Sequence, residues 1–197
     1  MAEIYFDIEV AYTNEKILEM LRQGHHIPSP TPAHCKIITI QYQFLDSAGK
    51  PKGELQIFRE WESSEESIIK KAYALVNPQT KWEVIPVGQN ILFDLGMLKG
   101  RAAEYGINYE EWFIYNDLPK IDVKAILQGM NGFQFKDSGL DKFTGKESSG
   151  IDVPLWYANK EYERILDYIR KEAKEFIEFY SKLKILLPEF RRQHGFF

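Results

Sequence analysis

A short apolar segment carrying two carboxylates constrains the fold of this chain more than any other feature. Residues 4–10 (IYFDIEV) are mostly β-branched or aromatic, which predicts a buried β-strand. Asp7 and Glu9 stand on alternate positions, and side chains two apart on a strand point to the same face. Because neighbouring carboxylates repel in an apolar setting, a divalent cation such as Mg²⁺ or Mn²⁺ is a natural counter-ion. The alternative is a surface strand whose acidic side faces water.

The composition permits such a site in an ordinary globular protein. The chain has 197 residues, 44% hydrophobic and 27% charged, and we predict that residues 1–197 form a single domain. It contains no apolar run of the roughly 20 residues that a membrane helix needs. The acidic strand begins too early to leave room for a signal peptide, and Cys35 is the only cysteine. We therefore predict a cytoplasmic protein with no membrane partner. The net charge of −4 does not exclude nucleic acid, because bound cations can supply positive charge locally.

The order of the predicted elements indicates an α/β fold. Further strands are predicted at residues 36–44, 54–61, 83–87 and 120–124. Helices are predicted at residues 15–22, 63–76, 91–105, 125–130, 138–143 and 160–186. Ser63 and Glu66 have the spacing of a capping box, and Pro188 follows the predicted end of the last helix. Residues 25–32 (HHIPSPTP) predict a loop.

The last helix places a carboxylate on its apolar side. At about 100° per residue, one stripe of the helix collects five apolar or aromatic side chains: Ile165, Ile169, Phe176, Tyr180 and Leu183. Glu172 falls within that stripe and Tyr168 lies at its edge, whereas Asp167 lies on the opposite side with Arg170 and Lys171. Glu172 is therefore predicted to point inward. The alternative is a boundary glutamate that reaches back to solvent.

Three segments together resemble a known family. YFDIEV, GQNILFDLGML and YIRKEAKEFIEFY are similar to the three motifs of the DEDD superfamily of 3′–5′ exonucleases, in the expected order. The nearest likeness is to the proofreading exonuclease domains of family B DNA polymerases and their stand-alone relatives. The resemblance covers nearly the whole chain. It implies a ribonuclease H-like fold, with a mixed, mainly five-stranded sheet flanked by helices.

The resemblance also implies which residues form the site. Asp7 and Glu9 match the acidic pair of the first motif, and Asp94 matches the aspartate of the second. Tyr168 matches the tyrosine of the tyrosine-type subclass, and Glu172 stands where that subclass has aspartate. A competing alignment would use Asp167, with Tyr162 in the place of a histidine, but the helical stripe disfavours it.

The implied chemistry is hydrolysis of a phosphodiester bond at the 3′ end of a single strand, with DNA favoured over RNA. Asp7, Glu9, Asp94 and Glu172 would hold two divalent cations, Mg²⁺ or Mn²⁺, about 4 Å apart, and Tyr168 would orient the attacking water. Substrate contacts are expected from three other residues: Val10, which replaces the threonine often found there, Asn90, and Phe93, which could stack on a base.

Other interpretations remain open at this level. A zinc site at His25, His26, His34 and Cys35 is disfavoured because no matched ligand pairs follow. Lysines at positions 120, 124, 136, 142 and 146 could form a rim for a phosphate backbone, but acidic residues are interspersed among them. A catalytically weakened or inactive binding or scaffold protein of the same fold is the main alternative. A polymerase or repair protein is a further expected partner.

Overall fold

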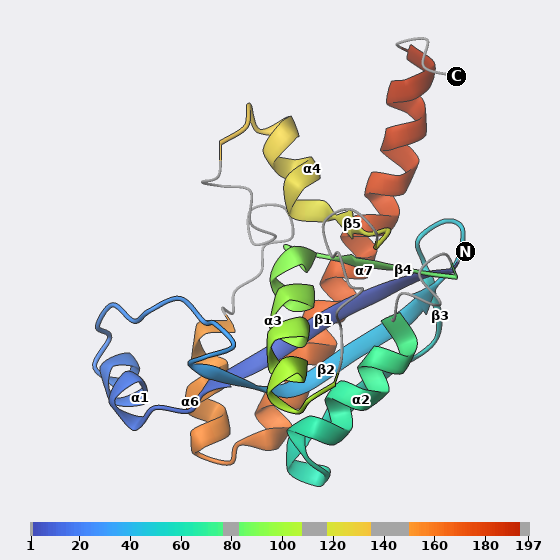
Figure 1. Ribbon diagram of the computed structural model, residues 1–197. Coiled ribbons are helices and arrows are strands. Elements are labelled where there is room, and N and C mark those ends of the chain that lie inside the picture. Colours follow the sequence, from blue (N-terminus) through green and yellow to red (C-terminus); the bar gives the residue numbers. More distant parts are fainter. Residues whose placement is uncertain (1, 77–82, 108–117, 135–149, 194–197) are drawn as a thin grey trace.

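A mixed five-stranded β-sheet forms the centre of the protein. The computed structural model describes residues 2–76, 83–107, 118–134 and 150–193 (Figure 1). The strand order is β3-β2-β1-β4-β5. Strands β1 (Ala2–Tyr12), β2 (Cys35–Leu45) and β3 (Pro51–Arg59) are antiparallel neighbours, while β4 (Val84–Gly88) and β5 (Ile121–Asp122) continue the sheet in parallel. The predicted α/β class with a mixed five-stranded sheet is confirmed.

Helices cover both faces of this sheet. Helices α2 (Glu65–Val76) and α3 (Ile91–Glu104) lie on one face, and α6 (Val153–Ala158) and α7 (Tyr162–Gln193) lie on the other (Figure 1). Helix α1 (Glu15–Arg22) lies beside α6, and α4 (Val123–Met130) follows β5 directly. Side chains of β1 pack on both faces of the sheet, where the described residues form three core clusters. Ile4, Phe6 and Ile8 pack toward α2 and α3, whereas Tyr5 packs with residues of α7.

The odd-numbered residues of β1 meet α7 in regular steps, which we call the β1–α7 ladder. Two strand residues advance roughly 6.6 Å and four helical residues roughly 6 Å, so the two series stay in step. The ladder pairs Glu3 with Tyr180 and Lys184, Tyr5 with Phe176, Asp7 with Glu172, and Glu9 with Tyr168. The first two steps, at Glu3 and Tyr5, are well packed. The ring centroids of Tyr5 and Phe176 lie 5.1 Å apart, and Lys184 Nζ lies 2.7 Å from Glu3 Oε1. This packing fixes the register at the next step, where two carboxylates meet.

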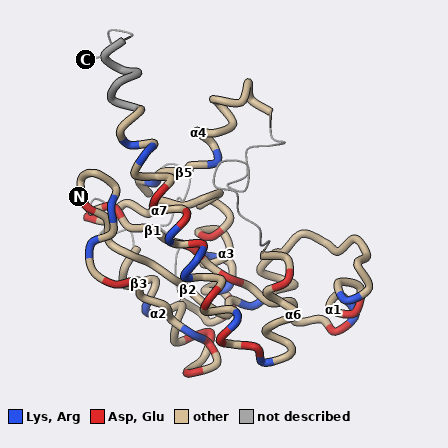
Figure 2. The backbone as a smooth tube through the Cα atoms, turned by 180° about the vertical axis from the view of Figure 1, so that it is seen from behind, with Lys and Arg blue, Asp and Glu red and all other residues tan. Residues whose placement is uncertain are grey.

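The solvent side of α7 carries both signs of charge. Figure 2 shows basic and acidic residues interspersed along this helix. Arg170 pairs with Asp167 at 2.9 Å, and the lysines at positions 171 and 174 face glutamates one turn later at 4.0 Å. Asp167 is thus an exposed surface residue, as the helical stripe predicted.

Several predicted boundaries are wrong for identifiable reasons. The third strand ends at Arg59, because residues 60–62 form a 3₁₀ turn. The hydroxyl of Ser64, not of Ser63, caps α2 by accepting from the Ser67 N–H at 3.1 Å. Strand β5 is shorter than predicted, since Asp122 already caps α4.

The last helix also differs from its prediction. It begins at Tyr162 and continues through Pro188 to Gln193. These last turns project beyond the sheet (Figure 1), where water can satisfy the carbonyl group that a proline leaves without a donor. The short helix α6 was not predicted, and the helix predicted at residues 138–143 lies outside the described residues.

Candidate metal centre and adjoining pocket

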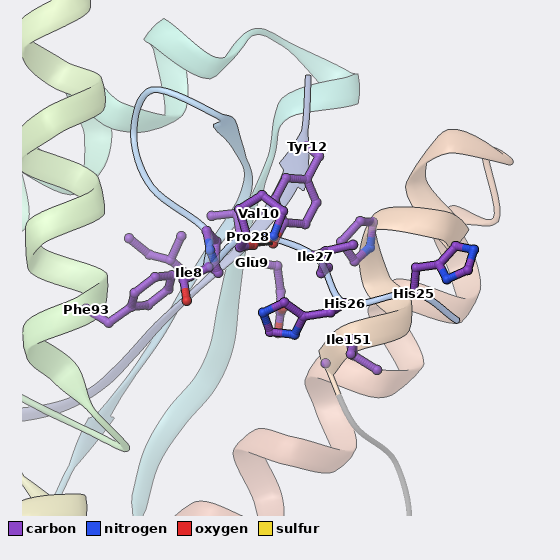
Figure 3. A pocket seen from close by; sticks show the side chains of 14 residues that line it. Ile8, Glu9, Val10, Tyr12, His25, His26, Ile27, Pro28, Phe93 and Ile151 are labelled. Carbon is purple, nitrogen blue, oxygen red and sulfur yellow. Dashed lines mark hydrogen bonds between the residues drawn. The ribbon is translucent and has the colours of Figure 1, made fainter. Parts of the chain in front are cut away.

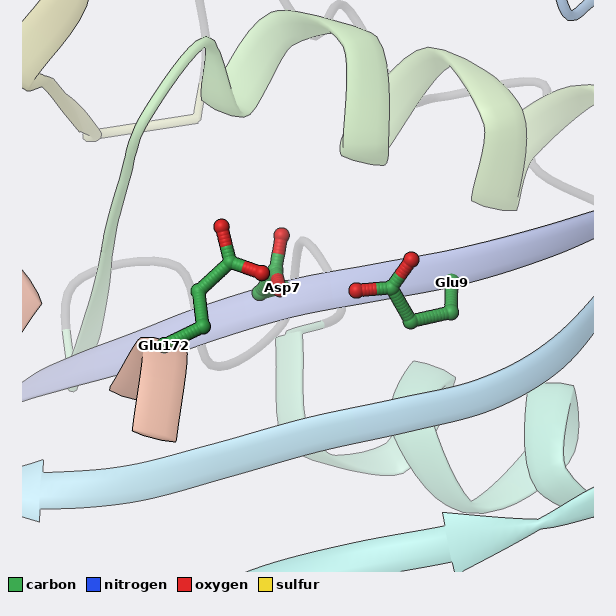
Figure 4. A group of neighbouring side chains, drawn as sticks. All are labelled: Asp7, Glu9 and Glu172. Atoms are coloured by element: carbon green, nitrogen blue, oxygen red, sulfur yellow. The ribbon is translucent and has the colours of Figure 1, made fainter. Parts of the chain in front are cut away.

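Three carboxylates converge between β1 and α7. Asp7, Glu9 and Glu172 each offer an oxygen atom, and these atoms all lie within 4.8 Å of one another (Figure 4). Glu9 is buried, while Asp7 and Glu172 are half-buried. This is the one such group of acidic, histidine and cysteine side chains in the part of the chain that the structure describes. Closely spaced carboxylate oxygens are the donor set that hard divalent cations such as Mg²⁺ and Mn²⁺ prefer, so the residues present fit the cations that the sequence implied.

Buried polar side chains of the sheet hold Asp7 in place. The Gln41 amide donates to Asp7 Oδ2 at 2.7 Å, and the Tyr5 hydroxyl donates to the same oxygen at 3.2 Å. The Thr39 hydroxyl in turn donates to the Gln41 carbonyl oxygen at 3.0 Å, which directs the amide NH₂ toward Asp7. Thr39 and Gln41 are fully buried. Sequence reasoning did not identify these two supporting residues, although their polar side chains within an apolar strand were a usable signal.

Asp94 stands beside the three carboxylates rather than within their group. Its side chain is 3% exposed, and Oδ1 accepts from the backbone N–H of Ile8 at 3.1 Å. That N–H is available because the pairing of β1 with β4 reaches only Tyr5. Burial raises the pKa of Asp94 well above its usual value, and the negative charges of Asp7 and Glu172 add to this effect. Without a cation, the carboxyl group of Asp94 therefore keeps its proton to a higher pH than an ordinary aspartate does.

Tyr168 forms the last step of the ladder beside Glu9. Burial raises the pKa of its hydroxyl far above the usual value, as do the charges of Glu9 and Glu172 and a hydrogen bond to Glu172. Trp156 packs edge-on against the ring at 5.8 Å. Gly150 leaves room for the hydroxyl, because a Cβ there would lie 3.1 Å from it. The tyrosine is thus a fixed, protonated hydrogen-bond donor at neutral pH.

Of the three predicted substrate residues, Val10 and Phe93 line a cavity together with Glu9, whereas Asn90 does not. Asn90 joins β4 to α3 in a left-handed conformation (φ 66°), and its backbone N–H donates to Asp122 Oδ1 at 3.0 Å. Phe93 lies in the first turn of α3, and Val10 follows a bulge in the β1–β2 pairing after Glu9. The substrate-binding roles of these three residues stay predictions.

That cavity opens directly beside Glu9. It has a volume of about 470 Å³ and is lined by Glu9, Ile8, Val10, Phe93, Ile27 and Ile151, among others (Figure 3). The lining is mainly apolar, and Glu9 is the carboxylate among its residues. Residues 25–30 form one wall, a contribution that the sequence analysis missed because it treated them only as a connecting loop.

The fold and the acidic site together define an α/β protein of the ribonuclease H-like architecture. Solved structures that share this fold include Escherichia coli exonuclease I with a dT13 oligonucleotide, with a TM-score of 0.51 and 15% identity over 85% of this chain. A zinc-bound complex of the same enzyme with single-stranded DNA has a TM-score of 0.51 and 14% identity over 86% of this chain. A product-bound exonuclease I structure has a TM-score of 0.50 and 13% identity, also over 86%.

The similarity to these solved structures shows that the chain shares their fold. The chain spans less than half of each neighbour, between 43% and 46% of its length. No protein-family model and no curated protein sequence matches the chain. The neighbours described are exonuclease I structures, so the predicted kinship with polymerase proofreading domains stays a prediction.

The described helices were also compared with the requirements of a membrane span. In residues 2–76, 83–107, 118–134 and 150–193, no helix is both long and apolar enough to cross a bilayer. The cytoplasmic location and the single-domain organisation stay predictions.

Proposed function

We propose that this chain is a metal-dependent 3′–5′ exonuclease that acts on single-stranded nucleic acid, with DNA as the favoured substrate. One observation carries the proposal: Asp7 and Glu9 of β1 and Glu172 of α7 meet within 4.8 Å at the edge of an apolar cavity. A protein that only bound nucleic acid would gain nothing from carboxylates placed where they repel phosphate. Exonuclease I, which has this fold, has been solved with oligonucleotides and with product.

The residues divide the work between holding cations and orienting water. Asp7, Glu9 and Glu172 would hold a divalent cation, and Asp94 beside them would help to hold a second. Bound divalent cations would neutralise the phosphate charge and activate the water that attacks phosphorus. Gln41 and Tyr5 keep the Asp7 carboxylate in one orientation.

Tyr168 fits the role of a positioning hydroxyl. Because burial and nearby carboxylates raise its pKa, it donates a hydrogen bond at neutral pH and does not act as a base. Its neighbour Glu172 replaces the aspartate of the tyrosine-type exonucleases. The glutamate reaches the same group as Asp7 and Glu9, and this supports the tyrosine-type alignment over the one that uses Asp167.

The proposal is tested with end-labelled single-stranded DNA and RNA of the same sequence. We expect 5′-mononucleotides to be released from the 3′ end in Mg²⁺ or Mn²⁺ and no release in EDTA. Asp7→Ala should abolish release, whereas Asp167→Ala, which removes an exposed carboxylate paired with Arg170, should leave it unchanged. Equal activity of wild type in EDTA would refute the metal mechanism. A folded wild type that binds Mn²⁺ but degrades neither strand would identify a non-catalytic protein of the same fold.

A further inference from the structure

One wall of the cavity is a loop that three anchors hold in place. Residues 23–34 connect α1 to β2, and the Tyr12 hydroxyl donates to the backbone carbonyl of Pro28 at 2.7 Å. Arg101 of α3 donates to the carbonyl of Pro32 at 3.1 Å. The Pro32 ring rests against Gly100, where a Cβ would lie only 2.4 Å from it.

The anchors are themselves fixed. Glu65, which is 5% exposed, accepts two hydrogen bonds from Arg101, at 2.7 and 2.8 Å. Burial, with a smaller effect of Cys35, raises the pKa of Tyr12 to about 12, so its hydroxyl keeps the proton that it donates to Pro28. These contacts hold the backbone of the loop beside the cavity at Pro28 and Pro32.

Among these side chains, the imidazole of His26 faces the carboxylate side of the cavity. His26 and Glu9 line the same cavity, and Figure 3 shows the His26 ring directed toward the side where Glu9 lies. The ring of the neighbouring His25 points the other way (Figure 3). The wall between Glu9 and Phe93 is apolar, formed by Ile8 and Val10. The exposed imidazole of His26, on the loop wall of residues 25–30, adds a hydrogen-bonding group to this mainly apolar cavity.

We propose that His26 hydrogen-bonds the 3′-hydroxyl of the terminal nucleotide and so selects strands that end in a free 3′-hydroxyl. This inference rests on the proposed function. If the carboxylates mark the position of the scissile phosphate, the sugar of the terminal nucleotide lies next to Glu9. Its base then lies against the apolar wall that includes Phe93. The 3′-hydroxyl is the free hydroxyl group of that sugar in DNA, and an imidazole nitrogen of His26 can form a hydrogen bond with it.

The test compares binding of two product-like probes, which require no turnover. Thymidine 5′-monophosphate and 2′,3′-dideoxythymidine 5′-monophosphate differ in the 3′-hydroxyl alone. In Mg²⁺, calorimetry should show that wild type binds the first about three- to tenfold more tightly, the range expected for one hydrogen bond. His26→Ala should bind both probes equally, and His26→Gln should recover part of the preference. His34→Ala, which removes an imidazole of the same loop outside the cavity lining, should behave like wild type.

A spectroscopic measurement separates a direct contact from a general structural effect. The chain has four histidines, so the imidazole resonances are few enough to assign. In wild type, the NMR signal of the His26 ring should shift when thymidine monophosphate binds and shift much less with the dideoxy probe. As a control for folding, His26→Ala should melt at the same temperature as wild type. If wild type showed no nuclease activity but still distinguished the two probes, the proposed function would be refuted and the role of His26 in binding would not. Active wild type without discrimination, or full discrimination in His26→Ala, would refute the role of His26.

Discussion

Removing one negative charge from the acidic group should stabilise the protein without metal and destabilise it with metal. Two unit charges 4.8 Å apart repel by about 3.5 kcal/mol at an effective dielectric constant of 20. Because Asp7 and Glu172 are half-exposed, solvent screening reduces the benefit of Glu172→Gln to about 1–2 kcal/mol. For a chain of this size, about 1 kcal/mol shifts the melting temperature by roughly 2–4 °C. We therefore expect Glu172→Gln to melt about 2–8 °C higher than wild type in EDTA.

The order should reverse when Mn²⁺ is added. A cation at 100 times its dissociation constant stabilises wild type by about 2.7 kcal/mol, and the variant loses most of this gain because it lacks one ligand. Thermal melting in EDTA and over a Mn²⁺ series measures both effects. Asp167→Asn is the matched control, since its carboxylate is exposed and pairs with Arg170. If Glu172→Gln melted earlier than wild type in EDTA and kept the full Mn²⁺ shift, Glu172 would have a structural role and the reasoning would be wrong.

Three further changes test other parts of the site. Tyr168→Phe should lower the turnover rate at least tenfold, measured by single-turnover kinetics, while the Mn²⁺-induced shift in melting temperature stays within error; loss of that shift would make Tyr168 a ligand. Because the pKa of Asp94 is higher in the folded than in the unfolded protein, protonation of Asp94 stabilises the fold. This contribution to the free energy of unfolding is complete below the unfolded pKa of about 3.9 and is lost as the pH rises through the folded pKa. In EDTA, the fall in melting temperature between pH 4 and neutral pH should thus be smaller for Asp94→Asn than for wild type, and parallel curves would refute this. Gly100→Ala places a methyl group where the Pro32 ring lies and should displace the loop at residues 23–34, which raises KM severalfold in steady-state assays while Mn²⁺ binding is unchanged.

The sequence predicts which way these side chains point, because the repeat of a strand or a helix depends only on residues close together in the sequence. Alternation along β1 places Asp7 and Glu9 on one face, and the helical repeat of α7 places Glu172 inward and Asp167 outward. The structure shows these orientations. The functional roles of these residues stay proposals. The separation of Asp94 from the group of three follows from where β4 stops pairing with β1, which no local pattern specifies.

Features that depend on tertiary contacts were not predicted, because no local pattern in the sequence specifies which segments pack together. Gln41 supports Asp7 only because β2 pairs with β1 in a particular register. The loop with His26 becomes a cavity wall only because Arg101 and Gly100 of α3 hold Pro32. Helix α6 has six residues, too few to display a helical repeat.

Because the β1–α7 ladder joins two distant parts of the sequence, the group of Asp7, Glu9 and Glu172 can form only after both parts have been synthesised. On the ribosome, the strand that carries Asp7 and Glu9 emerges long before the helix that carries Glu172. A growing chain therefore has two of the three ligands but cannot complete the centre until α7 has docked on the sheet. In the finished protein, any fluctuation that lifts α7 off β1 takes Glu172 and Tyr168 away together. Under the proposed function, cation binding would depend on the docking of α7, and a copy in which α7 has not docked would be inactive.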